Sequence, residues 1–242
     1  MNTRKADGGS AEIIGFVLII ALIVSVASVW ILIYLPNEGY SVETDHARLV
    51  TEQFADLKYG IDLLWITGHE GVSSGRLISP SPIEGTEISG LLFLSPPVGT
   101  GTITVGPGTI FTLTNVTSSN TINVSSLKIT YNSANYYAPD IRLVYDGGAV
   151  FRGDKDENPV LILPPSIGDD RLVLVNISSM SEQQILGNIP LSLTYTYKDT
   201  FNYDNVTVST PSSTYSWYND DLPANPVNVT VVQYDMVIGS SA

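Results

Sequence analysis

The residues best suited to catalysis are one serine and the two histidines of the chain. A Gly-x-Ser-x-Gly elbow, in which a serine between a strand and a helix attacks an acyl group, is matched by Gly71-Val72-Ser73-Ser74-Gly75. That chemistry needs a histidine later in the chain, whereas His46 and His69 both come before Ser73. The segment before the motif also has helical rather than strand spacing. We therefore interpret residues 71–75 as a linker and expect no catalytic residue.

Metal-binding residues are equally sparse. Two histidines without any cysteine do not make a typical zinc site, and His69-Glu70 lacks the second histidine of a His-Glu-x-x-His pattern. The run Asp154-Lys155-Asp156-Glu157-Asn158 offers oxygen ligands suited to Ca²⁺, but Lys155 and a missing glycine differ from a calcium-binding loop. We expect a solvated loop there, packing or surface roles for both histidines, and no metal or cofactor.

The charge balance argues against one class of partner. The 242-residue chain has 11 basic and 24 acidic residues, so it has no basic stripe with which to neutralise phosphates. Nucleic acid is therefore not an expected partner. The absence of cysteine excludes a disulfide framework, so the fold depends on its core.

An apolar segment from Ile13 to Leu35 is interrupted only by small residues. As a helix it would be roughly 34 Å long at about 1.5 Å per residue, enough for a bilayer core of about 30 Å. Its length argues against an ordinary cleaved signal peptide. Trp30 and Tyr34 lie near its end, where aromatic rings favour headgroups, and Pro36-Asn37-Glu38-Gly39 predicts a stop. Basic residues before the span and acidic residues after it predict a cytoplasmic N-terminus and an outer location for the rest.

The start of this segment carries a recognisable pattern. A short basic leader followed by Gly8-Gly9-Ser10-Ala11-Glu12-Ile13-Ile14-Gly15 resembles the class III signal of archaeal type IV pilin-like proteins. The resemblance implies that a prepilin peptidase cuts between Gly9 and Ser10, with a cut after Ala6 as the alternative. It also implies that the new terminal amine pairs with an acidic side chain of a neighbouring helix, the role of Glu12 here. Self-assembly would then use the small positions Gly15, Ala21, Ser25, Ala27 and Ser28.

Residues 37–70 are predicted to form a juxtamembrane amphipathic helix. Apolar side chains recur at helical spacing along one stripe, and charged residues lie elsewhere. Ser41 or Thr44 would cap its start, and Gly68 follows its end. We expect the stripe to pack on a β-rich domain, with contact between neighbouring subunits as the alternative. The stripe consists of Val42, Leu49, Val50, Phe54, Leu57, Ile61, Leu64 and Trp65.

Beyond Gly75 the apolar residues alternate with polar ones between turn residues. Short strands at intervals of about 8 to 12 residues favour an antiparallel sandwich or barrel. A helical turn is predicted at Ser212–Asp220. The predicted strands are Arg76–Ile78, Glu87–Leu94, Thr100–Val105, Thr109–Asn115, Ser126–Tyr131, Asp140–Tyr145, Ala149–Arg152, Val160–Leu163, Arg171–Ile177, Leu191–Tyr197, Asn205–Ser209 and Val227–Ile238.

Two turn signals lie in the middle of this region. Asp146-Gly147-Gly148 predicts a hairpin turn with positive φ, and Pro164-Pro165 predicts a strand end. The surrounding segments, Arg142–Arg152 and Val160–Ser166, are similar to an archaeal family of pilin-like secreted proteins whose function is not established. This likeness implies an architecture rather than an activity.

Five Asn-x-Ser/Thr sequons are candidate glycosylation sites in an outer domain, and each has Val or Ile in the middle. A strand explains the same pattern, because residues i and i+2 share the wet face while the β-branched residue points inward. The tyrosine pairs Tyr136-Tyr137 and Tyr195-Thr196-Tyr197 fit either an adhesive patch or cross-strand packing. The sequons begin at Asn115, Asn123, Asn176, Asn205 and Asn228.

These patterns predict a mainly β protein with an N-terminal transmembrane helix. The expected parts are a basic leader (1–9), a span (10–36), the juxtamembrane helix (37–70) and an extracellular β-rich domain (76–242). The expected function is structural or adhesive at the cell surface, as a type IV pilin-like filament subunit in contact with membrane lipid. The alternatives are a monomeric single-pass envelope protein that does not polymerise and an extracellular hydrolase. We do not expect an enzyme.

Overall fold

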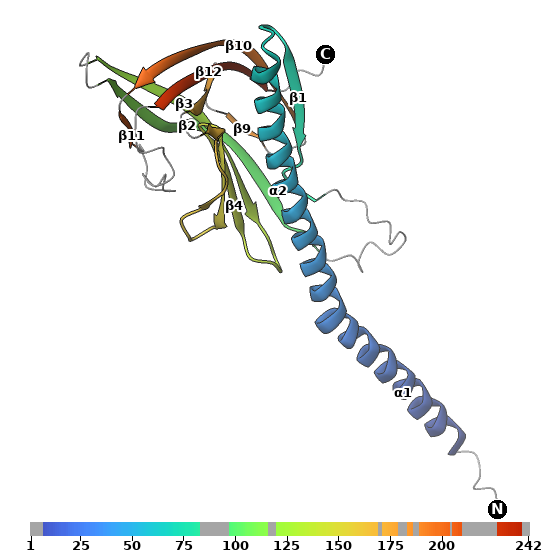
Figure 1. Ribbon diagram of the computed structural model, residues 1–242. Helices are drawn as coiled ribbons and strands as arrows, with labels where there is room; N and C mark the ends of the chain where they lie inside the picture. Colours follow the sequence, from blue (N-terminus) through green and yellow to red (C-terminus); the bar gives the residue numbers. More distant parts are fainter. Residues whose placement is uncertain are drawn as a thin grey trace, which may run out of the picture.

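One long helix carries two β-sheets at its C-terminal end (Figure 1). The helix consists of α1 (Asp7–Val29), a π-helical turn η1 (Trp30–Tyr34) and α2 (Leu35–Thr67). The protein is therefore mainly β with an N-terminal helix, as the sequence predicts. The computed structural model describes residues 7–82, 97–115, 120–168, 171–178, 183–185, 189–203, 205–209 and 227–238.

The predicted stop at Pro36–Gly39 is wrong, because the helix runs through it. The Leu35 N–H donates to the Trp30 carbonyl in an i to i−5 bond, so a π-helical turn lies directly before Pro36. This turn shifts the hydrogen-bond register where a proline ring would otherwise crowd the preceding turn. Gly39 does not end the helix but accommodates the ring of Tyr137, which a Cβ would overlap.

The other predicted helix boundaries have mixed outcomes. Ser41 and Thr44 lie inside α2 and cap nothing, since no break precedes them. At the far end Gly68 adopts a left-handed φ of 71°, and its N–H donates to the Leu64 carbonyl at 3.3 Å, so the predicted C-terminal glycine is confirmed. At the N-terminal end α1 already begins at Asp7, three residues before the predicted span.

The strands form two sheets that are almost entirely antiparallel. One sheet has the order β1-β10-β12-β8-β7, and the other has the order β11-β2-β3-β4-β5-β6 with β9 paired to β2. The exception to the predicted antiparallel pattern is the parallel pair β8 and β12. The strands are β1 (Ser73–Ile78), β2 (Thr100–Asn115), β3 (Asn120–Ala134), β4 (Ile141–Asp146), β5 (Ala149–Asp154), β6 (Val160–Leu163), β7 (Ile167–Gly168), β8 (Arg171–Ser178), β9 (Gln183–Ile185), β10 (Ile189–Tyr203), β11 (Asn205–Ser209) and β12 (Val227–Ile238).

Several strands are longer than predicted. The two predicted strands on either side of Gly106-Pro107-Gly108 are one strand, β2, with a bulge between Pro107 and Ile110. A bulge absorbs the extra residues without ending the ladder, which explains how glycine and proline are tolerated there. The short β7 and β9 were not predicted. The predicted strand Glu87–Leu94 and helical turn Ser212–Asp220 lie outside the described residues.

The two turn signals are confirmed. Gly147 and Gly148 have φ of 59° and 99° in the hairpin between β4 and β5, where glycine avoids the strain of a side chain. Strand β6 ends at Leu163, immediately before Pro164.

The sheets bury two hydrophobic clusters. The helix-side core joins α2 to both sheets and includes Phe54, Ile103 and Tyr234. The inter-sheet core contains strand residues alone, among them Phe111 and Leu174. Only the first core therefore holds the helix to the strands, and we call the two sheets together the head.

Candidate membrane anchor and its junction with the sheets

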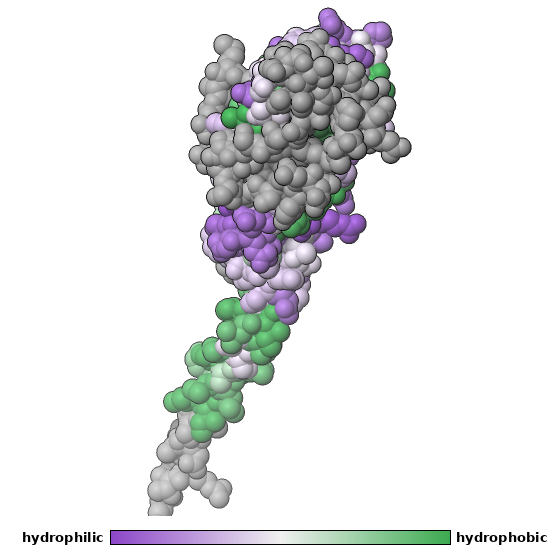
Figure 2. All heavy atoms as spheres, turned by 60° about the vertical axis from the view of Figure 1, so that its left-hand side comes forward, coloured by the Kyte–Doolittle hydropathy of each residue, from purple (hydrophilic) through white to green (hydrophobic). Residues whose placement is uncertain are grey.

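The first half of the long helix makes an apolar stem, residues 12–35. Every Ile, Leu, Val and Phe side chain from Ile13 to Ile33 is between 44% and 74% exposed. An 18-residue window of this helix has a mean hydropathy of 3.0, and none of that window is buried. Figure 2 shows the apolar stem giving way to hydrophilic residues at the base of the head. By length and composition this is a helix that can cross a membrane.

The two serine hydroxyls inside the stem are satisfied by the helix itself. The hydroxyls of Ser25 and Ser28 donate to the carbonyls of Leu22 and Val24 at 2.8 and 2.7 Å. A hydroxyl bonded in this way brings no unsatisfied donor into lipid. Both serines are therefore compatible with an apolar environment.

The residues predicted for processing and subunit contact lie at the start of α1. Gly9 and Ser10 fall within the first turns of the helix, and Glu12 is exposed one turn later. Neither cleavage nor pairing of Glu12 with another chain is tested by this arrangement, so both stay predictions.

The second half of the helix, residues 36–67, is docked on the head through one face. Val50, Phe54 and Leu57 are completely buried, and Ile61 is 1% exposed. Burying an aliphatic or aromatic side chain of this size stabilises a fold by about 1.5–3 kcal/mol, so this face alone holds the helix firmly. The predicted packing of the stripe is confirmed, except that Leu49 faces solvent with 40% exposure.

Glu43 fixes the end of this docked half that lies next to the stem. Its side chain is 1% exposed, and its Oε1 accepts the backbone N–H groups of Gly99 and Tyr136 at 2.9 and 2.8 Å. Its Oε2 accepts those of Tyr137 and Ala138 at 2.8 and 2.7 Å. One buried carboxylate thus satisfies four backbone donors from two loops, and charge-assisted bonds of this kind are stronger than neutral ones.

Ser79, just after β1, is held by two side chains of α2. Its carbonyl accepts a bond from His46 Nε2 at 3.0 Å, and its N–H donates to Gln53 Oε1 at 3.0 Å. Because a carbonyl only accepts, Nε2 must carry the proton of the neutral ring. Burial lowers the pKa of His46, and the bond to Ser79 opposes this only in part. His46 is therefore a neutral packing residue, one of the two roles predicted for it.

The far end of the docked half is tied to β12. The buried hydroxyl of Tyr234 donates to the carbonyl of Ile61 at 2.6 Å. The ring of Tyr234 lies 5.8 Å from that of Tyr195 in the helix-side core. Polar contacts therefore fix the helix to the head at both ends of the apolar stripe.

A second buried carboxylate serves the head alone. Asp146 is completely buried, and its Oδ2 accepts the N–H of Thr109 at 2.8 Å and the hydroxyl of Thr109 at 2.6 Å. It thereby joins the turn after β4 to the bulge of β2. These contacts give Asp146 a structural role.

The sequence elbow does not have the geometry of a nucleophile elbow. Ser73 is the first residue of β1, and α2 precedes it, so the order is helix then strand. The interpretation of 71–75 as a linker is wrong for 73–75, which belong to β1 and pair with β10, and Gly71 and Val72 also exchange backbone hydrogen bonds with Tyr195 of that strand. His69 is exposed.

The acidic loop 154–158 is exposed, and Lys155 in it pairs with the Asp140 carboxylate. The N–H of Lys155 donates to the Asp140 carbonyl at 3.0 Å, and the N–H of Glu157 donates to the Asp154 carbonyl at 3.1 Å. No group of three or more metal-ligating side chains occurs within the described part of the chain.

The asparagines of the five sequons lie on strands, with Asn115 as the last residue of β2. Asn123 is exposed while Val124 is buried, and Asn176 is partly exposed while Ile177 is buried, as alternation along a strand requires. The side chains of Asn115, Asn205 and Asn228 lie outside the described residues. Glycosylation itself stays a prediction.

The two tyrosine pairs have different environments. Tyr195 is 2% exposed and packs against Tyr234, so cross-strand packing is confirmed there. Tyr136 is instead 71% exposed in the loop between β3 and β4.

Sequence reasoning missed the polar residues that position the helix. Glu43 and His46 lie on the same helical face as Val50 and Phe54, which identifies them as buried polar groups in need of partners. The partners are backbone atoms of distant loops, which no side-chain pattern indicates.

No family model, curated protein or solved structure matches this chain.

Proposed function

We propose that this chain is a type IV pilin-like surface protein whose stem anchors it in the membrane and forms the core of a filament. The head is then the outer, structural or adhesive part, without turnover. The single observation that carries this proposal is the uniformly exposed apolar stem on a helix that continues rigidly into the head. Side chains of this kind require cover by lipid or by other helices.

The stem has features that suit both environments. It is apolar on every side, as a lipid-exposed helix must be, and it carries small residues at which helices approach closely. A shallow apolar groove at its end is lined by Ser25, Val29, Trp30 and Ile33, among others. Such a groove beside a small residue fits a neighbouring helix in a filament or an acyl chain in a bilayer.

Glu12 supplies the polar contact of the assembly. The side chain is exposed at the start of an otherwise apolar helix, where an isolated carboxylate is costly in lipid. A terminal amine created by cleavage before Ser10 lies close in sequence and would neutralise this carboxylate on a neighbouring subunit. The proposal therefore links leader removal to assembly.

Two measurements on material from the native envelope test the proposal. Mass spectrometry is expected to find a terminus at Ser10 or Asp7, and sedimentation with electron microscopy is expected to find filaments. Glu12→Gln should reduce the filament fraction, whereas Glu52→Gln, at an exposed carboxylate of α2, should leave it unchanged. An intact Met1 together with detergent extraction as a monomer would contradict the filament role.

That contradictory outcome is the signature of the second candidate function, a monomeric anchored envelope protein. The observation in its favour is that the stem alone satisfies the needs of a single-pass anchor without any neighbouring subunit.

A further inference from the structure

The loop between β3 and β4 lies close to the end of the stem. The ring of Tyr137 packs on Gly39, only four residues after Leu35, the last apolar residue of the stem. Four residues of helix span about 6 Å, and the headgroup layer on each side of a bilayer core is about 5–8 Å thick. If the stem spans the membrane, this loop is at the height of the headgroups.

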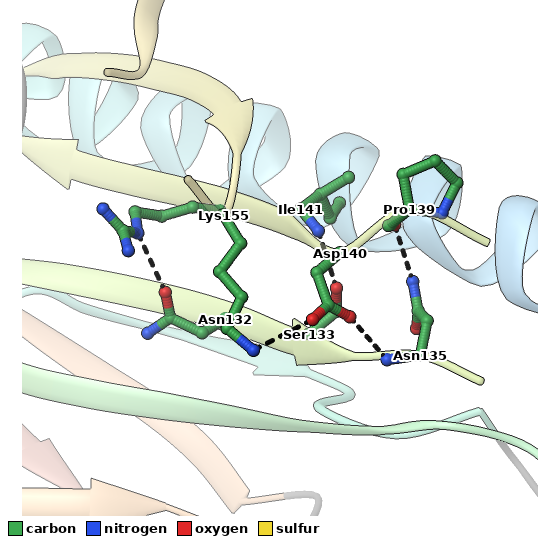
Figure 3. Close-up of polar contacts among 8 residues, drawn as sticks. Asn132, Ser133, Asn135, Pro139, Asp140, Ile141 and Lys155 are labelled. Carbon is green, nitrogen blue, oxygen red and sulfur yellow. Dashed lines mark hydrogen bonds and ion pairs between the residues drawn. The ribbon is translucent and has the colours of Figure 1, made fainter. Parts of the chain in front are cut away.

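The loop is held rigidly from both sides. The N–H groups of Tyr136, Tyr137 and Ala138 all donate to Glu43 of α2. On the other side the carboxylate of Asp140 accepts the N–H of Asn135 at 2.6 Å, and the Asn135 side-chain amide donates to the Pro139 carbonyl at 2.9 Å (Figure 3). The loop backbone thus has a fixed position relative to the helix.

Lys155 and Ser133 complete the support of the loop. The Lys155 ammonium lies 3.0 Å from the Asp140 carboxylate, and the N–H of Ile141 donates to the Ser133 hydroxyl at 2.7 Å (Figure 3). Burial acts to raise the pKa of Asp140, but the Asn135 N–H and Lys155 outweigh it and lower the pKa. Asp140 therefore stays ionised and keeps its bonds at neutral pH.

This fixed loop presents a tyrosine to the surroundings. Tyr136 is 71% exposed although its backbone is held by Glu43. Tyr34 and Tyr40, which lie before and after Leu35 on the helix, are 41% and 51% exposed, and Trp30 stacks on Tyr34 with ring centroids 3.9 Å apart. Amphipathic aromatic rings of this kind are favoured at the membrane–water interface.

We propose that the β3–β4 loop is a second membrane contact, with the Tyr136 ring in the lipid headgroup layer. The inference rests on the proposed spanning role of the stem. A helix alone leaves the head free to tilt with the span, whereas a loop contact beside the helix sets the angle of the head to the bilayer. The expected partner is a lipid surface without net charge. Acidic residues Asp154, Asp156 and Glu157 surround Lys155 in sequence and would repel anionic lipid.

Depth measurements on single-cysteine variants test this contact. The chain has no cysteine, so Tyr136→Cys, Tyr59→Cys and Leu22→Cys each give one labelling site. The full chain is labelled with a fluorophore and placed as single copies in phosphatidylcholine nanodiscs that contain lipid spin-labelled in the headgroup or in the acyl chain. Tyr59 is the matched control, because it is 68% exposed but lies 24 residues beyond Leu35, about 36 Å along the helix.

The three labels separate failure of this contact from failure of the anchor. We expect headgroup quenching at position 136 several-fold stronger than at position 59, unchanged by added salt, and acyl-chain quenching at position 22. Equal, weak quenching at 136 and 59 with strong quenching at 22 would overturn the loop contact alone and leave Tyr136 as a surface for a protein partner. Absence of quenching at 22 would overturn the anchor, and the loop contact with it.

Discussion

The stem and the docked half are parts of one helix with opposite relations to their surroundings. The stem is apolar on all sides and buries none of its most apolar window, whereas the docked half buries one face and exposes the rest. A helix that is apolar on all sides can be covered by any apolar surroundings, because apolar contacts are not directional. A helix with a buried carboxylate and a buried imidazole packs in one register only, because both groups need their hydrogen-bond partners. Apolar side chains therefore determine which surroundings a helix needs, and buried polar groups determine how it is positioned.

Within the docked half, apolar and polar contacts also differ. The apolar stripe packs through Phe54, Leu57 and Ile61, while Glu43 and His46 near the stem and the Tyr234 hydroxyl at the far end supply polar bonds. The apolar stripe supplies most of the stabilisation, and the polar contacts set the position along the helix.

The largest expected difference in stability is between a phenylalanine of the docked half and one of the stem. Phe54→Ala should destabilise the head by about 3–5 kcal/mol, because Phe54 is completely buried in the helix-side core. Phe16→Ala should leave the unfolding of the head unchanged, since Phe16 is 64% exposed on the stem. Denaturant titration of the full chain in detergent checks both. Equal losses of stability would mean that the two halves are not separable.

Glu43→Gln tests the polar contact at the end of the docked half next to the stem. The amide that replaces one carboxylate oxygen would face N–H donors, and the charge would be lost, so we expect a loss of about 2–4 kcal/mol. Glu52→Gln is the matched control, because Glu52 only pairs with Arg48 on the exposed face of the same helix and should cost at most about 0.5 kcal/mol. Thermal unfolding of both variants measures the difference. An unaffected Glu43→Gln variant would show that the four bonds to Glu43 do not stabilise the head.

Two glycines give a smaller contrast. Gly39→Ala would force the Tyr137 ring away from α2 and should cost about 1–2 kcal/mol, since a new methyl group there overlaps the ring. The new methyl group of Gly15→Ala would have no atom within 4 Å, so this variant should leave the stability of the head unchanged. The same thermal unfolding assay applies, and a stabilised Gly39→Ala variant would show that the close approach of the ring is not required.

The smallest expected effect is a pH dependence carried by His46. Its folded-state pKa is lowered by burial, so below the unfolded value of about 6.5 the unfolded chain binds a proton that the folded chain refuses. Stability should therefore fall as the pH drops through this window toward the folded-state pKa. His46→Gln keeps a donor for Ser79 and should reduce that dependence, whereas His69→Gln, at an exposed site, should retain it. Unfolding temperatures at about pH 7.5 and about pH 5.5 test this, and a wild-type slope in His46→Gln would contradict it.

The sequence predicts those features of the fold that a local pattern defines. The apolar helix, the apolar stripe around Phe54, the glycine turn at Gly147 and most strands follow from spacing and residue type. The predicted stop at Pro36 is wrong because a π-helical turn precedes the proline, and residue type alone does not indicate such a turn. The glycines and proline of the β2 bulge likewise predict two strand ends where one strand continues.

The junction was the least predictable part of the candidate site. Glu43 is recognisable as a polar residue on a buried face, but its four partners are backbone N–H groups from loops more than fifty residues away. Backbone donors carry no residue type that a sequence pattern could reveal. Only the three-dimensional arrangement identifies Glu43 as a residue that positions the head on the docked half of the helix.

Flotation of the full chain with liposomes tests most directly whether the stem alone anchors the protein. Purified chain is mixed with phosphatidylcholine liposomes, detergent is removed, and the sample is centrifuged in a density gradient. We expect wild type to float and the stem variant Leu18→Lys with Ile23→Lys to stay at the bottom, because each lysine costs about 3 kcal/mol in the bilayer core. Tyr59→Lys with Leu63→Lys, on the exposed face of α2, should float. A stem double variant that floats like wild type would contradict anchoring by the stem.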